Sequence, residues 1–132
     1  MKAKIIFSLP IFVLFLSFTL YDQTNDWVVP AKYEEMENPQ DADQASLKTG
    51  KSLYNKHCGS CHGKEGLGDG TKAAQLDTPC GDFSTAEFHS QSDGAIFYKS
   101  IEGRDDMPNF RKKIPYEEDV WHIVNYIKTF EE

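Results

Sequence analysis

The sequence Cys58-Gly59-Ser60-Cys61-His62 places two thiols three positions apart and an imidazole directly after the second thiol. On one helical turn, side chains at this spacing lie on the same face. Such a pair can reach the vinyl groups on two adjacent pyrrole rings of a haem, and the following imidazole can then bind the iron. This is the attachment pattern of c-type haem. The motif predicts one covalently bound haem c, with Cys58 and Cys61 as thioether partners and His62 as an iron ligand.

Two other chemistries also use a pair of cysteines at this spacing. A zinc site needs two further ligands, and the only other cysteine of the chain is Cys80. A thioredoxin-like redox site belongs to a βαβ unit, which the sequence does not indicate. Haem attachment is therefore the preferred interpretation. It leaves Cys80 over, and we expect an inert free thiol there in preference to an intermolecular disulfide or a redox group.

The N-terminus has the order of a secretory signal, with a short basic start and then an apolar run over residues 5–20. This run of 16 residues is shorter than the roughly 20 that a spanning helix needs. Because no strong cleavage site follows it, residues 1–21 are expected to be either a signal peptide or an N-terminal membrane anchor. Either one sends the globular part to the periplasm, where haem c is attached, and an anchor would also associate the protein with the membrane.

The charge of the chain is strongly acidic. Removing residues 1–21, with Lys2 and Lys4, leaves 12 basic and 21 acidic side chains, a formal charge of −9. Such a surface argues against nucleic acid as a partner, because both would be negatively charged. It favours a redox protein with a basic patch, since opposite fields speed the encounter of two proteins.

The rest of the sequence indicates an all-α fold of three to five helices with long loops. Residues 22–43 are expected to form an extended N-terminal extension on the surface of the domain or on a partner, and residues 44–132 the domain itself. Apolar spacing and capping residues predict helices over 45–57, over 95–101 and after Pro115. Within the first, Gly50 lowers helix stability, which a close helix crossing would explain.

The iron would need a second axial ligand opposite His62. Met107 lies in a connector over residues 104–113 between two predicted helices, and Pro108 stiffens it. A thioether suits an iron that changes charge with little rearrangement, and it raises the reduction potential. The alternative interpretations are that Met107 only fills a gap in the core, or that His89 is the ligand. Pro79 is expected to lie beside His62, where its carbonyl accepts a hydrogen bond from the ring N–H that does not face the iron.

From about residue 45 to residue 130 the chain resembles a class I (mitochondrial-type) cytochrome c. The resemblance rests on the attachment motif, the glycine loop after it, Met107-Pro108, and aromatic residues of the last helix. It implies the cytochrome c fold, in which Gly50 and Tyr54 of the first helix face Trp121 and Tyr126 of the last. Residues 27–39 also resemble an extension on bacterial single-haem cytochromes, notably of the Bacteroidetes group, which are associated with respiratory complexes.

The expected function is electron transfer in a respiratory chain, with iron cycling between Fe(II) and Fe(III) and without substrate chemistry. The redox partners would be a quinol-oxidising complex or a terminal oxidase. Two alternatives stay open. One is a fixed haem c subunit of a membrane respiratory complex, docked through residues 27–39. The other is a haem c sensor or enzyme with a labile sixth ligand.

Overall fold

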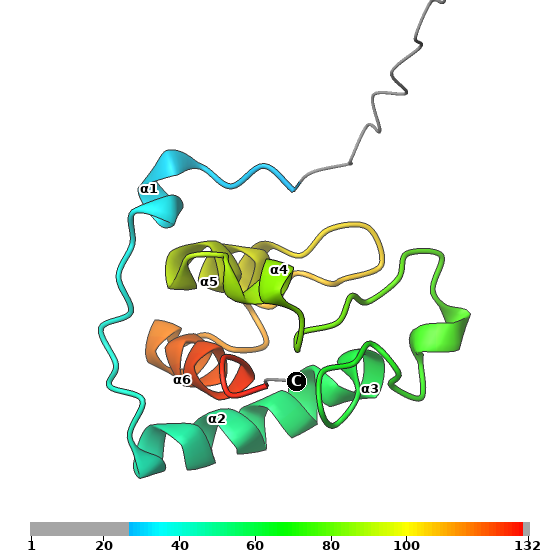
Figure 1. Ribbon diagram of the computed structural model, residues 1–132, viewed down its shortest axis with the longest axis horizontal. Helices are drawn as coiled ribbons and strands as arrows, with labels where there is room; N and C mark the ends of the chain where they lie inside the picture. The colour runs from blue at the N-terminus through cyan, green and yellow to red at the C-terminus, as the bar shows by residue number, and fades with distance from the viewer. Residues whose placement is uncertain (1–26, 131–132) are drawn as a thin grey trace, which may run out of the picture.

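A computed structural model of the protein describes residues 27–130, so the expected signal or anchor over residues 1–21 lies outside the described residues. In this part the protein is helical (Figure 1), with the following elements in chain order: α1 (Ala31–Glu34), α2 (Gln44–His57), α3 (Gly59–His62), the 3₁₀ helix η1 (Ala73–Gln75), α4 (Ala86–His89), α5 (Asp93–Glu102) and α6 (Glu117–Ile127). The only β pairing among these residues is an isolated bridge between Arg104 and Met107. None of the helices within residues 27–130 is both long enough and apolar enough to cross a membrane.

The all-α class is confirmed, but the predicted number of three to five helices is too low. Six α-helices are described, and three of them, α1, α3 and α4, have only four residues each. Helix α4 was missed because one turn is too short for a periodic apolar pattern. Its start is marked only by Thr85, whose hydroxyl accepts a hydrogen bond from the backbone N–H of Phe88 at 3.2 Å.

Helix α2 begins at a side-chain cap and leads directly to the attachment motif. The Asp43 carboxylate accepts a hydrogen bond from the backbone N–H of Ser46 at 2.8 Å, which satisfies one free donor of the first turn. The buried residues of α2 are Ser46, Gly50 and Tyr54, four positions apart, so one narrow stripe of the helix faces the core.

The two longest helices, α2 and α6, cross in backbone contact at Gly50, as the sequence predicted. A Cβ atom at position 50 would lie 1.9 Å from the carbonyl oxygen of His122 and 2.8 Å from the Cβ of Tyr126. One turn further along α2, the buried ring of Tyr54 meets the rings of Tyr126 and Phe130 edge-on, with centroids 5.5 and 5.3 Å away. The crossing therefore fixes where α2 ends and where the attachment motif begins.

Helix α6 also packs against α5, and here the core is centred on an aromatic stack. Trp121 lies parallel to Phe97 of α5, with ring centroids 4.1 Å apart and planes inclined by 17°. The resemblance placed Trp121 opposite Gly50 and Tyr54, but its stacking partner is on α5. Val120 and Val124 complete the most deeply buried part of α6. Helix α6 thus holds α2 and α5 together (Figure 1).

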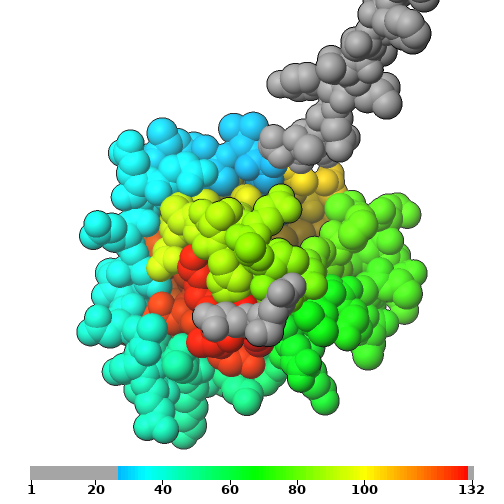
Figure 2. All heavy atoms as spheres, in the orientation of Figure 1, coloured from blue at the N-terminus to red at the C-terminus, as the bar shows by residue number. Residues whose placement is uncertain are grey.

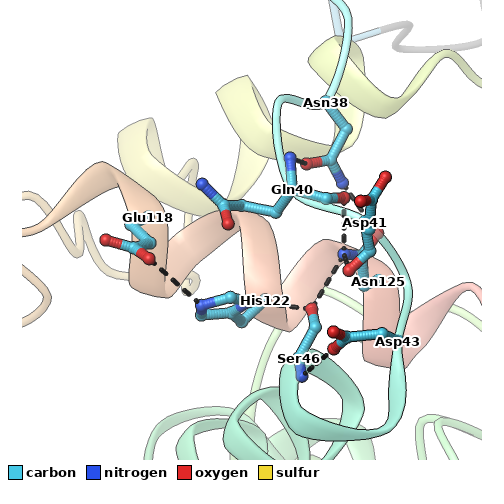
Figure 3. Close-up of polar contacts among 8 residues, drawn as sticks. All are labelled: Asn38, Gln40, Asp41, Asp43, Ser46, Glu118, His122 and Asn125. Carbon is cyan, nitrogen blue, oxygen red and sulfur yellow. Dashed lines mark hydrogen bonds and ion pairs between the residues drawn. The ribbon is translucent and has the colours of Figure 1, made fainter.

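Residues 27–43, which we call the strap, pack on the domain surface, as one of the two alternatives predicted. Asn125 of α6 binds the strap through its side chain, accepting from Asn38 at 2.8 Å and donating to the carbonyl of Gln40 at 3.0 Å (Figure 3). Asn125 also donates to the hydroxyl of Ser46, which in turn lies 2.8 Å from Nδ1 of His122. This polar network joins the strap to α2 and α6.

We expect Gly50→Ala to destabilise the protein by about 1–3 kcal/mol, because overpacking forces the two helix backbones apart. The loss should appear as a lower midpoint of chemical denaturation. Gly59→Ala is a matched control, since its Cβ would meet no atom closer than 3.7 Å. It should change the free energy of unfolding by less than about 0.5 kcal/mol. Equal effects of the two substitutions would contradict a backbone contact at position 50.

Candidate functional site

The attachment motif lies on one helical turn, as its spacing predicted. Helix α2 ends at His57, its C-cap Cys58 has a backbone still in the helical region, and α3 follows from Gly59 to His62. The carbonyl of Cys58 accepts hydrogen bonds from the N–H groups of Cys61 and His62, both at 3.0 Å. The two cysteines and the histidine are therefore held by one turn at the end of a helix that the core fixes.

Tyr54 fixes the far side of this turn. Its hydroxyl donates a hydrogen bond of 2.7 Å to the carbonyl of Gly63, the residue directly after the motif. Burial is the main reason why the pKa of Tyr54 is raised far above its usual value, with nearby Cys58 adding to it. The phenol therefore stays protonated and remains a donor. The motif is thus held at its start by α2 and at its end by a side chain of the same helix.

The His62 ring lies in an aromatic environment that the sequence analysis missed. Phe83 stacks on His62 with ring centroids 4.5 Å apart, and Phe88 stacks on Phe83 at the same distance. The backbone N–H of Phe83 donates to the carbonyl of Gly66 at 2.8 Å, which ties this column to the glycine loop. An aromatic residue after Gly81 is too weak a signal to predict this contact.

His62 has the electrostatic properties of a neutral ligand. Burial lowers its pKa, and a backbone contact with Cys80 opposes this effect. The contact does not amount to a hydrogen bond, so Nδ1 of His62 is buried and has no hydrogen-bond partner among the described residues. A buried, unpaired ring nitrogen is costly. A neutral imidazole in a dry environment is also the form that binds a metal.

The thiols do not have the properties of a redox-active pair. Burial raises the pKa of Cys58 to about 12, with a smaller contribution from Cys61, so Cys58 stays a neutral thiol. Reactive thiols of redox enzymes instead have a lowered pKa. The pKa of Cys80 is also raised, chiefly by desolvation. Within residues 27–130, no group of three or more His, Cys, Asp or Glu side chains is arranged to hold a metal, so the zinc alternative finds no ligand set there.

Met107 lies in the connector and is partly buried against the core. A tight turn presents it: the N–H of Met107 donates to the carbonyl of Arg104 at 2.8 Å, and Asp105 adopts a left-handed φ of 52°. Asp adopts this conformation more readily than most non-glycine residues do. Further along, the buried ring of Phe110 fixes the end of the connector in the core.

One hydrogen bond brings the Met107 turn to the loop that carries Pro79. Asp106 accepts from the backbone N–H of Thr78 at 2.8 Å. After desolvation, Cys61 and then Asp106 raise the pKa of the Cys80 thiol, so this thiol lies within electrostatic range of both side chains. The structure therefore brings together three segments named from the sequence: the attachment motif, the Pro79–Cys80 loop and the Met107 turn.

The remaining histidines are engaged elsewhere in the fold. His89, the alternative second ligand, forms a short contact through Nε2 with the backbone carbonyl of Phe130. His57 lies edge-on against Phe110. His122 lies in the polar network of α2 and α6, 2.8 Å from the Ser46 hydroxyl and 3.7 Å from Glu118 (Figure 3). The ring of His89 is therefore engaged with the backbone, and ligation by Met107 stays a prediction.

These residues fit a covalently attached haem. The motif supplies two free thiols and an imidazole, and the imidazole has a buried nitrogen without a partner among the described residues. When bound, haem supplies an iron that gains and loses one electron. The chain's own contribution is to fix the imidazole through α3 and Phe83, and to keep water away by the surrounding aromatic rings.

The fold and this donor set define the molecule as a c-type cytochrome. The sequence model of one family, described as "Cytochrome C oxidase, cbb3-type, subunit III", matches residues 45–127. Because the match covers more than half of the chain, the protein belongs to this family. Haem c is bound covalently at the Cys58–His62 motif, in agreement with the prediction from the sequence.

Solved structures also share this fold, and one of them is named a c-type cytochrome. The chain is 25% identical to a chain of the "Kuenenia stuttgartiensis reducing HAO-like protein complex Kustc0457/Kustc0458", with a TM-score of 0.64, covering 71% of this chain and 47% of that chain. It is 29% identical to the "KustC0563 c-type cytochrome", with a TM-score of 0.55, covering 63% of this chain and 98% of that one. This chain thus spans about half of the first relative. No curated protein matches it.

The cysteines provide a direct test of covalent attachment. We expect Cys58→Ala and Cys61→Ala each to remove one thioether, so that haem retention on a denaturing gel and the haem-containing mass both fall. Cys80→Ser is the matched control, because this third thiol lies outside the motif, and it should keep haem fully attached. If Cys80→Ser lost haem as readily as the other two variants, the assignment of the thioether partners would be wrong.

Proposed function

We propose that the protein is a single-haem electron carrier of the periplasm that serves a respiratory chain, with His62 and Met107 as the axial iron ligands. Family membership supports haem-based electron transfer. The observation that carries the ligand assignment is the approach of the Met107 turn to the loop beside His62 through Asp106 and Thr78. With both axial positions filled, neither oxygen nor peroxide finds an open iron, which favours electron transfer over catalysis.

The proposal also gives a role to Pro79, next to the iron-binding ring. A carbonyl that accepts a hydrogen bond from the free ring N–H of His62 would fix the ring and make it a stronger donor to iron. The backbone of the adjacent Cys80 already acts on the pKa of His62, which supports a role for this loop. We infer that the Pro79 carbonyl takes this role in the haem-loaded protein.

The proposed domain organisation has an exported globular domain over residues 44–132, preceded by an extension over 22–43 and a signal peptide or anchor over 1–21. The start of α2 at Gln44, capped by Asp43, supports the boundary of the domain. The redox partner is proposed to be a quinol-oxidising complex or a terminal oxidase. The formal charge of −9 without residues 1–21 supports a partner with a basic patch.

A fixed subunit of a membrane complex is the second candidate function, because a relative of this fold is part of a protein complex. The sequence analysis expects such a subunit to dock on its complex through residues 27–39. In this structure those residues cover their own domain, with Asn38 bound to Asn125. This arrangement favours the shuttle, since a segment already bound to its own domain is less available to a partner.

Binding to the isolated partner complex separates these two functions. A shuttle should bind with a Kd that rises steeply with salt, because its encounter relies on screened surface charges. A fixed subunit should instead co-purify with the complex in detergent and resist salt. Salt-resistant co-purification would therefore overturn the shuttle and support the fixed subunit.

We expect Met107→Ala to open the iron to carbon monoxide in the reduced protein at neutral pH and to lower the reduction potential. Axial ligands set haem potentials over about 0.8 V, so a shift on the order of 100 mV is expected. An optical spectrum of the wild type, extended to the near infrared, should contain the weak band of methionine on ferric haem.

Two control variants sharpen this test. Lys112→Ala alters an exposed side chain of the same connector and should leave the spectrum and the potential unchanged. His89→Ala should also leave the axial ligation intact. If His89→Ala opened the iron and Met107→Ala did not, the second ligand would be His89. An open iron in the wild type would instead favour the sensor or enzyme.

A further inference from the structure

The strap contacts the connector that carries Met107, and these contacts lie on both sides of this residue. The ring of Trp27 lies below the guanidinium of Arg104, 4.9 Å from the ring centroid. The Tyr33 hydroxyl accepts a hydrogen bond from Arg111 at 3.4 Å. Arg104 precedes Met107 by three residues, and Arg111 follows it by four. Two residues of the strap thus contact the connector, one before and one after the methionine.

The strap itself has a fixed position on the domain. A Cβ atom at Gly94 of α5 would lie 1.9 Å from the carbonyl oxygen of Tyr33 and 2.8 Å from the Cβ of Met36, so the strap backbone lies directly on α5. The Tyr33 ring also packs on the ring of Tyr98, with centroids 4.7 Å apart. At its other end the strap is bound by Asn125, as Figure 3 shows. Figure 2 shows the strap, in blue, adjoining the gold atoms that follow α5.

The half of the connector near Met107 is mostly exposed at its surface. Residues 105, 106, 108 and 109 are exposed, whereas Met107 itself is partly buried against the core. The backbone of Met107 and Pro108 lies close to Gly103, and Asp106 is bound by the N–H of Thr78. The buried part of the connector begins at Phe110. Contacts from other elements add to these in fixing the position of the sulfur. The strap supplies two of them through Arg104 and Arg111, the second of which is also bound to Glu102.

We propose that the strap is a positioning device for the second iron ligand: Trp27 and Tyr33, acting through Arg104 and Arg111, hold Met107 on the iron and set how easily other ligands displace it. This inference rests on the proposed axial ligation by Met107. It gives residues 27–36 a role within the cytochrome domain, in place of a role in docking to a partner.

Displacement of the sulfur by added imidazole tests the proposal in the full, haem-loaded ferric protein. The readouts are the loss of the near-infrared band and the imidazole concentration at half displacement. Trp27→Leu removes the ring under Arg104 and should lower that concentration about two- to fivefold, the range expected for an exposed cation–π contact. Trp27→Phe keeps an aromatic face and should restore most of the effect.

A second variant displaces the strap by a substitution that lies outside both the strap and the connector. Gly94→Ala places a Cβ where the Tyr33 carbonyl lies, so it should displace both contacts and lower the half-displacement concentration by about tenfold, more than Trp27→Leu does. Val28→Ala is a control in the strap itself, since Val28 is 82% exposed. Ile123→Val is a control for stability, because it weakens the buried core and alters neither the strap nor the connector. Both controls should match the wild type in imidazole displacement.

The outcomes separate this inference from the function on which it rests. In the first outcome the wild type has the methionine band, and imidazole displaces the sulfur equally easily from the wild type, Trp27→Leu and Gly94→Ala. The strap then has no positioning role, while ligation by Met107 stands. If Ile123→Val eases displacement as much as these two variants, the effect is one of general stability and the proposal fails. If the wild type lacks the band and Met107→Ala alters nothing, both the ligation and the strap's role are overturned.

Discussion

The carbonyl oxygen of His122 occupies the space that any side chain at position 50 would need. The crossing of α2 and α6 depends on this contact, and the location of the haem-binding motif depends on the crossing. Tyr54, one turn beyond Gly50, is clamped by two aromatic rings and hydrogen-bonded to Gly63 at the end of the motif. A single buried stripe of α2 thus connects the close contact of two backbones to the placement of a cofactor. The burial of Tyr54 and its hydrogen bond to Gly63 make this connection, and no charged group takes part in it.

The two proposed iron ligands are supported in different ways. His62 stands on a helical turn that continues α2, and Phe83 packs on its ring, so its position follows from the core. Met107 stands on a turn without helix or strand, in a half of the connector that is mostly exposed. A ligand on such a segment is held by whatever packs against the segment from outside. This difference explains why the strap matters more for Met107 than for His62.

The helices and the attachment site could be predicted because their signals are local. Cysteine spacing defined the motif, and Gly50 within an otherwise regular helix indicated a close crossing. Which helices pack against each other was harder to predict, because periodicity identifies the apolar face of a helix and not the neighbour that this face meets. Trp121 was therefore expected opposite Gly50, but it stacks on Phe97. The stack of Phe83 on His62 had no local signal, since it joins the end of α3 to a distant loop.

The sequence predicted the strap only as a choice between the domain surface and a partner, and its contacts could not be predicted for a related reason. They are made by single polar or aromatic residues, such as Asn38 with Asn125, separated by irregular backbone. Such contacts leave no repeating pattern in the sequence. A small domain buries a limited core, so a surface segment that packs on it adds a large fraction of new contacts. An electron carrier gains from this arrangement in a specific way. Its iron changes charge at every turnover, and a ligand turn braced from two sides moves less when it does.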